Sequence, residues 1–304
     1  MSRFFVFLIS ILISIPVFAQ TYHDHLIRGL HLFSGHQYNA AAEAFSKAVA
    51  LNPDHDDGWF RRGQAYLELG RHTEAISDFS KTISIRPAHG EAYYFRALAG
   101  IQKGNNGDAL KDLNKALEID SALVMAYLVR AEIAVKAGRN GEVLNDLNKA
   151  INLAPLNSNA YFMRARVLLR NGQAEKALED LGQAIKFDPD NPEMRLERSQ
   201  ILLNIRMFSE AAEDMTIAIE NGFDYAEMFQ MRASAWFQAE MFSQAISDYT
   251  RLINTFRLRT EQNYFNRGLA RLNTNDLSGA CEDLRKAASL GHTEAEKRAG
   301  ELCK

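Results

Sequence analysis

Histidines near the amino-terminal end form the first group of residues that could do chemistry. The group is His23, Asp24, His25, His31 and His36. Imidazole and carboxylate groups bind zinc, and bound zinc can activate water, so these residues could serve a metal-dependent enzyme or accessory protein. If residues 22–35 are helical, His23 and His31 share a face while His25 points elsewhere, so one helix cannot direct them all at one ion. The other interpretation is a solvated first helix.

Two cysteines, Cys281 and Cys303, form the second group. A catalytic thiolate needs a neighbouring base, and no histidine recurs near Cys281 in the pattern of the chain. The sequence also contains no glycine-rich phosphate loop, no HExxH or GxSxG motif and no cysteine pairs at metal-binding spacing. We therefore predict a protein that is not an enzyme and that needs no cofactor or metal.

The composition is that of a soluble, folded protein. Of 304 residues, 47% are hydrophobic, and the six prolines and 18 glycines are few, which favours long helices over a turn-rich β fold. The 35 basic and 38 acidic side chains give a formal net charge of -3. This balance provides no charged surface for nucleic acid or an anionic membrane, so we expect protein or peptide partners.

The segment 1–19 is typical of a secretory signal peptide. Arg3 precedes an apolar run from Phe4 to Ile15, Pro16 interrupts it, and small residues lead to a cleavage site after Ala19. An uncleaved anchor is the alternative, but the apolar segment is shorter than the roughly 20 residues that span a bilayer. We expect a periplasmic or secreted protein with no membrane span after cleavage.

A 34-residue repeat dominates the sequence. An arginine followed by a small residue occurs eight times, and the small residues are Gly29, Gly63, Ala97, Ala131, Ala165, Ser199, Ala233 and Gly268. The spacing is 34 six times and 35 once, with the extra residue near Thr255 to Thr260. An aromatic residue four before the small one, alanines 12 and 19 after it, and a bulky apolar residue 16 after it keep the same register in most units.

This pattern resembles the tetratricopeptide repeat family, whose 34-residue units are helix–turn–helix pairs. The segment 279–295 also resembles the ending of other exported bacterial proteins of this family. The resemblance implies an all-α, right-handed superhelical solenoid of eight units with a concave side. The expected units are residues 22–55, 56–89, 90–123, 124–157, 158–191, 192–225, 226–260 and 261–294, followed by a capping helix at 294–304.

Physical reasoning about the columns agrees with such a fold. The small residues let the two helices of a unit approach closely, and the aromatic columns fill the remaining gaps. One unit cannot bury its apolar faces alone, so stability comes from stacking on its neighbours. Repeats one, six and seven depart most from the columns; Arg195, for example, replaces the aromatic residue of repeat six.

Arginine and aspartate columns predict a series of ion pairs. Seven units carry an aspartate directly before the bulky apolar residue: Asp78, Asp112, Asp146, Asp180, Asp214, Asp248 and Asp283. The first unit has Ala44 instead, so pairing within each unit leaves only Arg28 without an acid, whereas pairing between units leaves three charges alone. We predict pairing within units, and matched acids argue against a basic stripe that binds anions.

The two cysteines are predicted to form a structural disulfide, because an exported chain with an even cysteine count favours one. Both cysteines are equally far along the chain from His292, which lies in a turn between the last two helices. An antiparallel helix pair would therefore place both at the same height. Such a bridge would fasten the capping helix, and two buried thiols are the alternative.

One face of the first helices is expected to line a partner-binding groove. The sites three before, one after and five after the small residue share this face, which lines the concave side in the family. The candidate residues are Phe60, Gln64, Glu68, Tyr94, Leu98, Gln102, Leu128, Glu132, Lys136, Phe162, Arg166 and Arg170. An aromatic and aliphatic strip with variable polar neighbours suits an extended peptide or a partner helix. A solvated face with no single ligand is the alternative.

Charge changes sign along this expected groove. Acidic residues lie on repeats two and three and basic residues on repeats four and five: Asp57, Glu68 and Glu91, then Lys136, Arg166 and Arg170. A bound segment could be oriented by its own charge gradient. The lysine and asparagine pattern of the carboxylate clamp that binds chaperone tails in some relatives is not visible.

The sequence thus predicts a non-enzymatic interaction scaffold of the cell envelope. A metal-dependent activity of the histidine group is the rival hypothesis, and self-association through exposed repeat ends is a third. The identity of the partner and the oligomeric state stay open, since this fold fixes a shape and a few variable side chains choose the ligand.

Overall fold

A computed structural model describes residues 21–303, except for the side chain of Asn140. The predicted signal peptide, residues 1–19, lies outside the described residues. The described part contains 17 α-helices and no strand, so the predicted all-α class is confirmed. Among its helices, none has the length and apolar character needed to cross a membrane.

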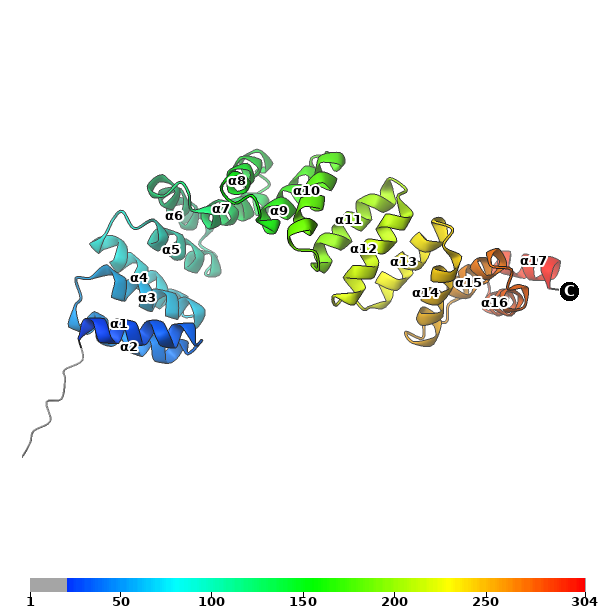
Figure 1. The fold of residues 1–304 in the computed structure, drawn as a ribbon, viewed down its shortest axis with the longest axis horizontal. Coiled ribbons are helices and arrows are strands. Elements are labelled where there is room, and N and C mark those ends of the chain that lie inside the picture. The colour runs from blue at the N-terminus through cyan, green and yellow to red at the C-terminus, as the bar shows by residue number, and fades with distance from the viewer. Residues whose placement is uncertain (1–20, 304) are drawn as a thin grey trace, which may run out of the picture. The chain divides into compact units, whose positions relative to one another are not determined.

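Helix pairs follow one another along the chain (Figure 1). The first helices of the eight repeats are α1 (Tyr22–Ser34), α3 (Asp56–Glu68), α5 (Gly90–Gln102), α7 (Val124–Lys136), α9 (Ser158–Arg170), α11 (Pro192–Asn204), α13 (Ala226–Gln238) and α15 (Glu261–Asn273). The second helices are α2 (Tyr38–Leu51), α4 (His72–Ile85), α6 (Asn106–Ile119), α8 (Asn140–Leu153), α10 (Ala174–Phe187), α12 (Phe208–Glu220), α14 (Phe242–Asn254) and α16 (Leu277–Ser289). A last helix, α17 (Thr293–Leu302), follows them.

The described residues form two compact units, residues 21–126 and 127–303. In the amino-terminal unit each helix from α1 to α6 packs on the next, and in the carboxyl-terminal unit the helices from α8 to α17 do the same. The extra residue of repeat seven falls in the turn between α14 and α15. Serial packing of this kind gives each helix pair only its neighbours as partners, as stacking of repeats requires.

The small residue of each repeat packs against the bulky apolar residue of the second helix. A Cβ placed on Gly63 would lie only 2.8 Å from the ring of Phe79, and Gly29 is pressed against Phe45 in the same way. The bulky residues Phe45, Phe79, Leu113, Leu147 and Leu181 are all 0% exposed. The two helices of a repeat can therefore approach closely only because this site is small.

Arginine–aspartate pairs join the two helices of a repeat, as predicted. In repeat five, Arg164 donates from Nε and Nη2 to the two carboxylate oxygens of Asp180, each at 2.7 Å. The same two-bond pair recurs in six other repeats: Arg62–Asp78, Arg96–Asp112, Arg130–Asp146, Arg198–Asp214, Arg232–Asp248 and Arg267–Asp283. The prediction of pairing within each repeat is confirmed.

A third bond from these arginines reaches the preceding repeat, and the sequence analysis missed it. Arg164 Nη1 donates to Asn148 Oδ1 at 2.7 Å, on the second helix of repeat four. Equivalent bonds join Arg62 to Ser46, Arg96 to Ser80, Arg232 to Thr216 and Arg267 to Thr250. Before Arg198 this position is Gly182, which offers no side-chain oxygen. Each linking arginine thus ties three helices together.

The aromatic residue three before the arginine completes this arrangement. The guanidinium of Arg62 lies 4.8 Å from the ring centroid of Trp59, whose Nε1 donates to the carbonyl of Pro53. In repeat six Arg195 stands in place of the aromatic residue and donates both to Pro189 O and to Asp214, each at 2.9 Å. A cation at this position therefore keeps the bond to the preceding turn and adds a second positive charge beside the aspartate.

Polar side chains begin most of the first helices by capping free backbone N–H groups. At α5 the imidazole Nδ1 of His89 accepts from Ala92 N at 3.3 Å, while the ring lies against Phe60 with centroids 4.5 Å apart. Burial of the ring, together with the nearby Arg86, lowers the pKa of His89 despite the opposing carboxylates of Asp56, Glu91 and Asp57. The folded amino-terminal unit therefore favours neutral His89.

We expect the amino-terminal unit to lose stability as the pH falls below about 6.5, the ordinary pKa of histidine. The unfolded chain then binds a proton at His89 that the folded unit resists, so this contribution is present above that pH and lost on acidification. His89→Asn keeps a capping oxygen, like Asn157 at α9, but does not titrate. Unfolding measured at pH 7 and pH 5 should show a weaker pH dependence in this variant, and an unchanged dependence would contradict the prediction.

A disulfide joins α16 to the end of α17. Cys281 and Cys303 are bonded, with their Cα atoms 5.5 Å apart, so the predicted bridge is present in the structure. Helix α17 covers an apolar cluster of Phe265, Leu284 and Ala287, into which it places its own Ala295. The last helix therefore closes the end of the carboxyl-terminal unit.

Candidate functional site

Four of the apolar members of the predicted groove are buried. Phe60, Tyr94, Leu128 and Phe162 are 2%, 8%, 5% and 8% exposed. Phe60, for example, packs on Phe79 and Phe95, with ring centroids 5.9 and 5.6 Å apart. These side chains of the predicted strip therefore hold each repeat together, and a ligand would reach little of their surface.

The polar members of the face are more exposed. Glu68, Glu132, Lys136, Arg166 and Arg170 are exposed, and Gln64 is half-buried. Leu98, an apolar member, is also half-buried. On the amino-terminal unit, Asp57 pairs with Arg61 at 3.3 Å, and Arg61 also donates to Gln64 at 3.2 Å. The acidic end of the predicted gradient is thus partly neutralised by an arginine that the sequence analysis did not consider.

A hollow of about 450 Å³ lies on the carboxyl-terminal unit, over the first helices α7, α9 and α11. Five predicted groove residues line it: Glu132, Lys136, Phe162, Arg166 and Arg170. Val135, Asn159, Met163, Val167 and Glu193 complete the lining. We define these ten residues as the first-helix hollow.

Helix geometry explains the residues that the sequence analysis missed. Asn159 and Glu193 lie six before the small residue of their repeats, and Val135 lies four after it. These positions are about one turn or less from the chosen columns around the same helix face, so a wider choice of columns would have found them. The other predicted groove residues, Phe60, Gln64, Glu68, Tyr94, Leu98 and Leu128, do not line this hollow.

Ion pairs border the hollow. Lys136 Nζ lies 2.8 Å from Glu132 on α7, and Arg166 Nε lies 3.3 Å from Glu197 on α11. The guanidinium of Arg166 also lies 5.7 Å from the ring centroid of Phe162. Exposed pairs of this kind contribute little to stability, so their charges can turn to an incoming ligand at small cost. The hollow therefore has an apolar part and an edge that carries both positively and negatively charged side chains.

The histidine group of the rival hypothesis is dispersed. His23 and His31 are exposed on α1, whereas His25 is buried in place of the usual aromatic residue. Asp24 closes the capping box of α1, and bonds from the Thr21 backbone and hydroxyl lower the pKa of its carboxyl. Across residues 21–303, no three His, Cys, Asp or Glu side chains lie close enough to hold a metal ion.

Comparisons with known proteins agree on one repeat type. Models described as tetratricopeptide repeat match residues 28–89, 90–123 and 147–179. No curated protein matches the sequence.

Solved structures of similar fold include PilF of Pseudomonas aeruginosa, at 20% identity and a TM-score of 0.57, over 66% of this chain and 92% of that one. A tetratricopeptide repeat protein from Parabacteroides merdae covers 82% of this chain and 99% of its own, at 16% identity and a TM-score of 0.52. MamA has 18% identity and a TM-score of 0.50, over 56% and 93% of the two chains. At these identities the likeness shows the fold alone.

Proposed function

Because the chain belongs to the tetratricopeptide repeat family, we propose that it is a non-enzymatic scaffold of the cell envelope that binds a peptide or helix of a partner protein. The observation that carries this proposal is the first-helix hollow on α7, α9 and α11. Repeat stacking produces such a surface from variable side chains on regularly spaced helices, which is how these folds present binding sites.

The hollow has the size and chemistry of a protein-binding site. Its volume of about 450 Å³ accepts several side chains of an extended segment or one face of a short helix. Val135 and Met163 provide partly exposed apolar surface in the hollow, while Arg166, Arg170 and Glu193 form a charged rim. An apolar centre within a polar rim provides affinity from the apolar part and register from the rim.

Two features support a location in the cell envelope. Residues 1–19 have the pattern of a secretory signal peptide, which would carry the chain across the inner membrane. The disulfide between Cys281 and Cys303 suits an oxidising compartment, because reducing pools in the cytosol keep thiols free. Both features favour the same side of the membrane.

Charge reversal at the rim should weaken binding of the partner. Partners are first captured from a native envelope fraction with the chain from Gln20 onward, then purified. We expect Arg166→Glu with Arg170→Glu to weaken binding of a purified partner about tenfold or more, since charged contacts at a rim position the ligand. Calorimetric titration measures the change.

The matched control reverses two charges on second helices of the same unit. Lys149 on α8 and Lys176 on α10 lie outside the hollow, so Lys149→Glu with Lys176→Glu makes the same change in net charge away from it. This control should bind like the wild-type protein. Equal affinity of all three proteins would exclude the hollow as the binding surface.

A further inference from the structure

Helix α17 resembles the first helix of an incomplete ninth repeat. Its third residue, Ala295, is buried like the third residues of α5 and α9, Ala92 and Ala160. Five positions later Gly300 occupies the small site, yet no atom lies within 4 Å of where its Cβ would be. No second helix follows in the described residues, and Glu296, Lys297 and Glu301 are exposed. A polar outer face of this kind is what terminates a stack of repeats.

The two bonded cysteines stand at a pair of repeat positions that hold contacting apolar residues at other junctions between repeats. Cys281 directly follows Ala280, the alanine that lies 12 residues after the small residue of repeat eight. Cys303 lies three residues after Gly300. At two other junctions these positions hold Ala42 with Tyr66 and Ala212 with Trp236, each pair within one apolar cluster. At the last junction alone among the described repeats, a covalent bond replaces the contact of the two side chains.

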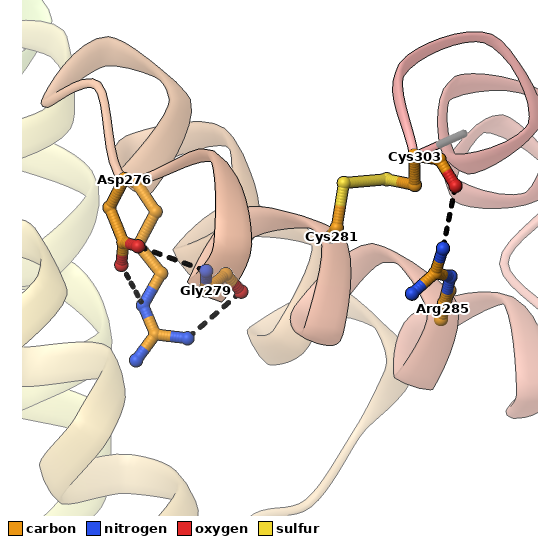
Figure 2. Close-up of a disulfide and its surroundings, with 6 residues drawn as sticks. Asp276, Gly279, Cys281, Arg285 and Cys303 are labelled. Carbon is orange, nitrogen blue, oxygen red and sulfur yellow. Dashed lines mark hydrogen bonds and ion pairs between the residues drawn. A yellow bond between two sulfur atoms is a disulfide. The ribbon is translucent and has the colours of Figure 1, made fainter.

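Helix α17 buries few of its side chains. It has ten residues, of which only Ala295 is buried, whereas the preceding first helix, α15, buries five. The ring of His292 stacks on Phe265 with centroids 4.0 Å apart. Figure 2 shows the disulfide and the bond that Arg285 donates to the carbonyl of Cys303 at 2.6 Å. A helix this short is marginal without packing, so its docking depends strongly on the bridge.

The two cysteine residues differ in exposure. Cys281 is 8% exposed, whereas Cys303 is half-buried just beyond the last turn of α17. An incoming thiolate therefore reaches Cys303 more readily, and Cys281 is the leaving group.

From these observations we propose that the Cys281–Cys303 disulfide is a redox latch on α17. A dithiol reductant attacks the sulfur of Cys303, forms a mixed disulfide and releases Cys281 as a thiolate, which takes up a proton. The second thiol of the reductant then displaces Cys303. Two electrons and two protons pass to the protein, giving two thiols and an oxidised reductant.

Reduction frees α17 and uncovers the end of the stack. The surface beneath it includes the buried Phe265 and the partly buried Tyr264, Leu269 and Leu272 of α15. The rest of the carboxyl-terminal unit keeps its own ion pairs and apolar clusters, so the change stays local. The bridge thus controls whether this apolar end is covered.

Hydrogen exchange of the chain from Gln20 onward tests the latch, with and without dithiothreitol. Backbone amides of α17 should exchange on the order of 100-fold faster after reduction, the effect expected from losing a cross-link that closes a loop of this length. Peptides from α9 to α14 should keep their rates. Protection of α17 that is unchanged by reduction would overturn the proposal, and so would loss of protection throughout the unit, which would make the bridge a global staple.

A double variant separates reduction from other effects of the reagent. Cys281→Ser with Cys303→Ser cannot form the bridge, so α17 should exchange fast in both conditions. Binding of the apolar dye anilinonaphthalene sulfonate should rise on reduction of the wild-type protein and be high in the variant throughout. A variant that still responds to dithiothreitol, or dye binding that never changes in the wild type, would contradict the latch.

Discussion

Replacing Asp283 with alanine is expected to destabilise the carboxyl-terminal unit by about 3–5 kcal/mol, the usual cost of leaving buried charge without its partner. Asp283 is 2% exposed and accepts from Arg267 at 2.8 and 2.7 Å. Arg271 donates to the same carboxylate at 2.9 Å. Alanine would leave two guanidinium groups, one of them on the buried Arg267, without this acceptor. Urea unfolding followed by circular dichroism measures the loss.

Asp108→Ala provides the control for this prediction. Asp108 also pairs with a cation, Lys111 at 2.9 Å, but both side chains are more than three quarters exposed. Solvent already screens that pair, so its loss should not change the unfolding midpoint measurably. Similar destabilisation by the two substitutions would show that burial does not set the importance of the arginine–aspartate pairs.

Gly63→Ala is expected to destabilise the amino-terminal unit by about 1–3 kcal/mol, because the added methyl group overpacks a closed contact with the Phe79 ring. Repeats three to five carry alanine at the small site and leucine at the bulky site, as at Ala97 and Leu113. Gly63→Ala with Phe79→Leu reproduces that pair and should recover most of the loss. The two substitutions should therefore be strongly non-additive.

The control for this pair is Gly107→Ala on α6. Gly107 lies in a helix like Gly63, but nothing lies within 4 Å of its added Cβ, so alanine should be tolerated or slightly stabilising. Thermal unfolding of the four variants and the wild type tests the scheme. If Phe79→Leu fails to relieve Gly63→Ala, close approach of the helices is not set by the volume of this pair.

Much of the fold could be predicted from the sequence because the residue types at the contact positions recur in eight repeats. Matched columns predict the helix pairs, and the count of unpaired charges predicts that Arg164 bonds to Asp180 within its repeat. The third bond, to Asn148, escaped because that column holds serine, asparagine or threonine, which share only a hydrogen-bonding oxygen. A search for recurring residue types therefore misses a position at which only a side-chain oxygen recurs.

The candidate site was harder to predict than the fold. Phe162 and Arg166 are four residues apart on one helix face, yet the first is buried and the second exposed. Packing of the neighbouring repeat decides which of these residues is buried. The periodicity within one helix does not predict that packing. The hollow therefore became visible only where three repeats are placed together.

Gly182 leaves the junction between repeats five and six without a hydrogen bond that other junctions have. At other junctions an arginine donates a hydrogen bond to a side-chain oxygen of the preceding repeat. Unfolding of one repeat there also removes a hydrogen bond from its neighbour. Between repeats five and six this bond has no acceptor, because glycine stands where Asn148 and Thr216 stand at other junctions. This junction therefore depends on apolar packing, in which Ile185 of α10 shares a cluster with Met194 and Ile201 of α11, and on the Arg166–Glu197 ion pair. Unfolding of repeat six would remove no such hydrogen bond from repeat five.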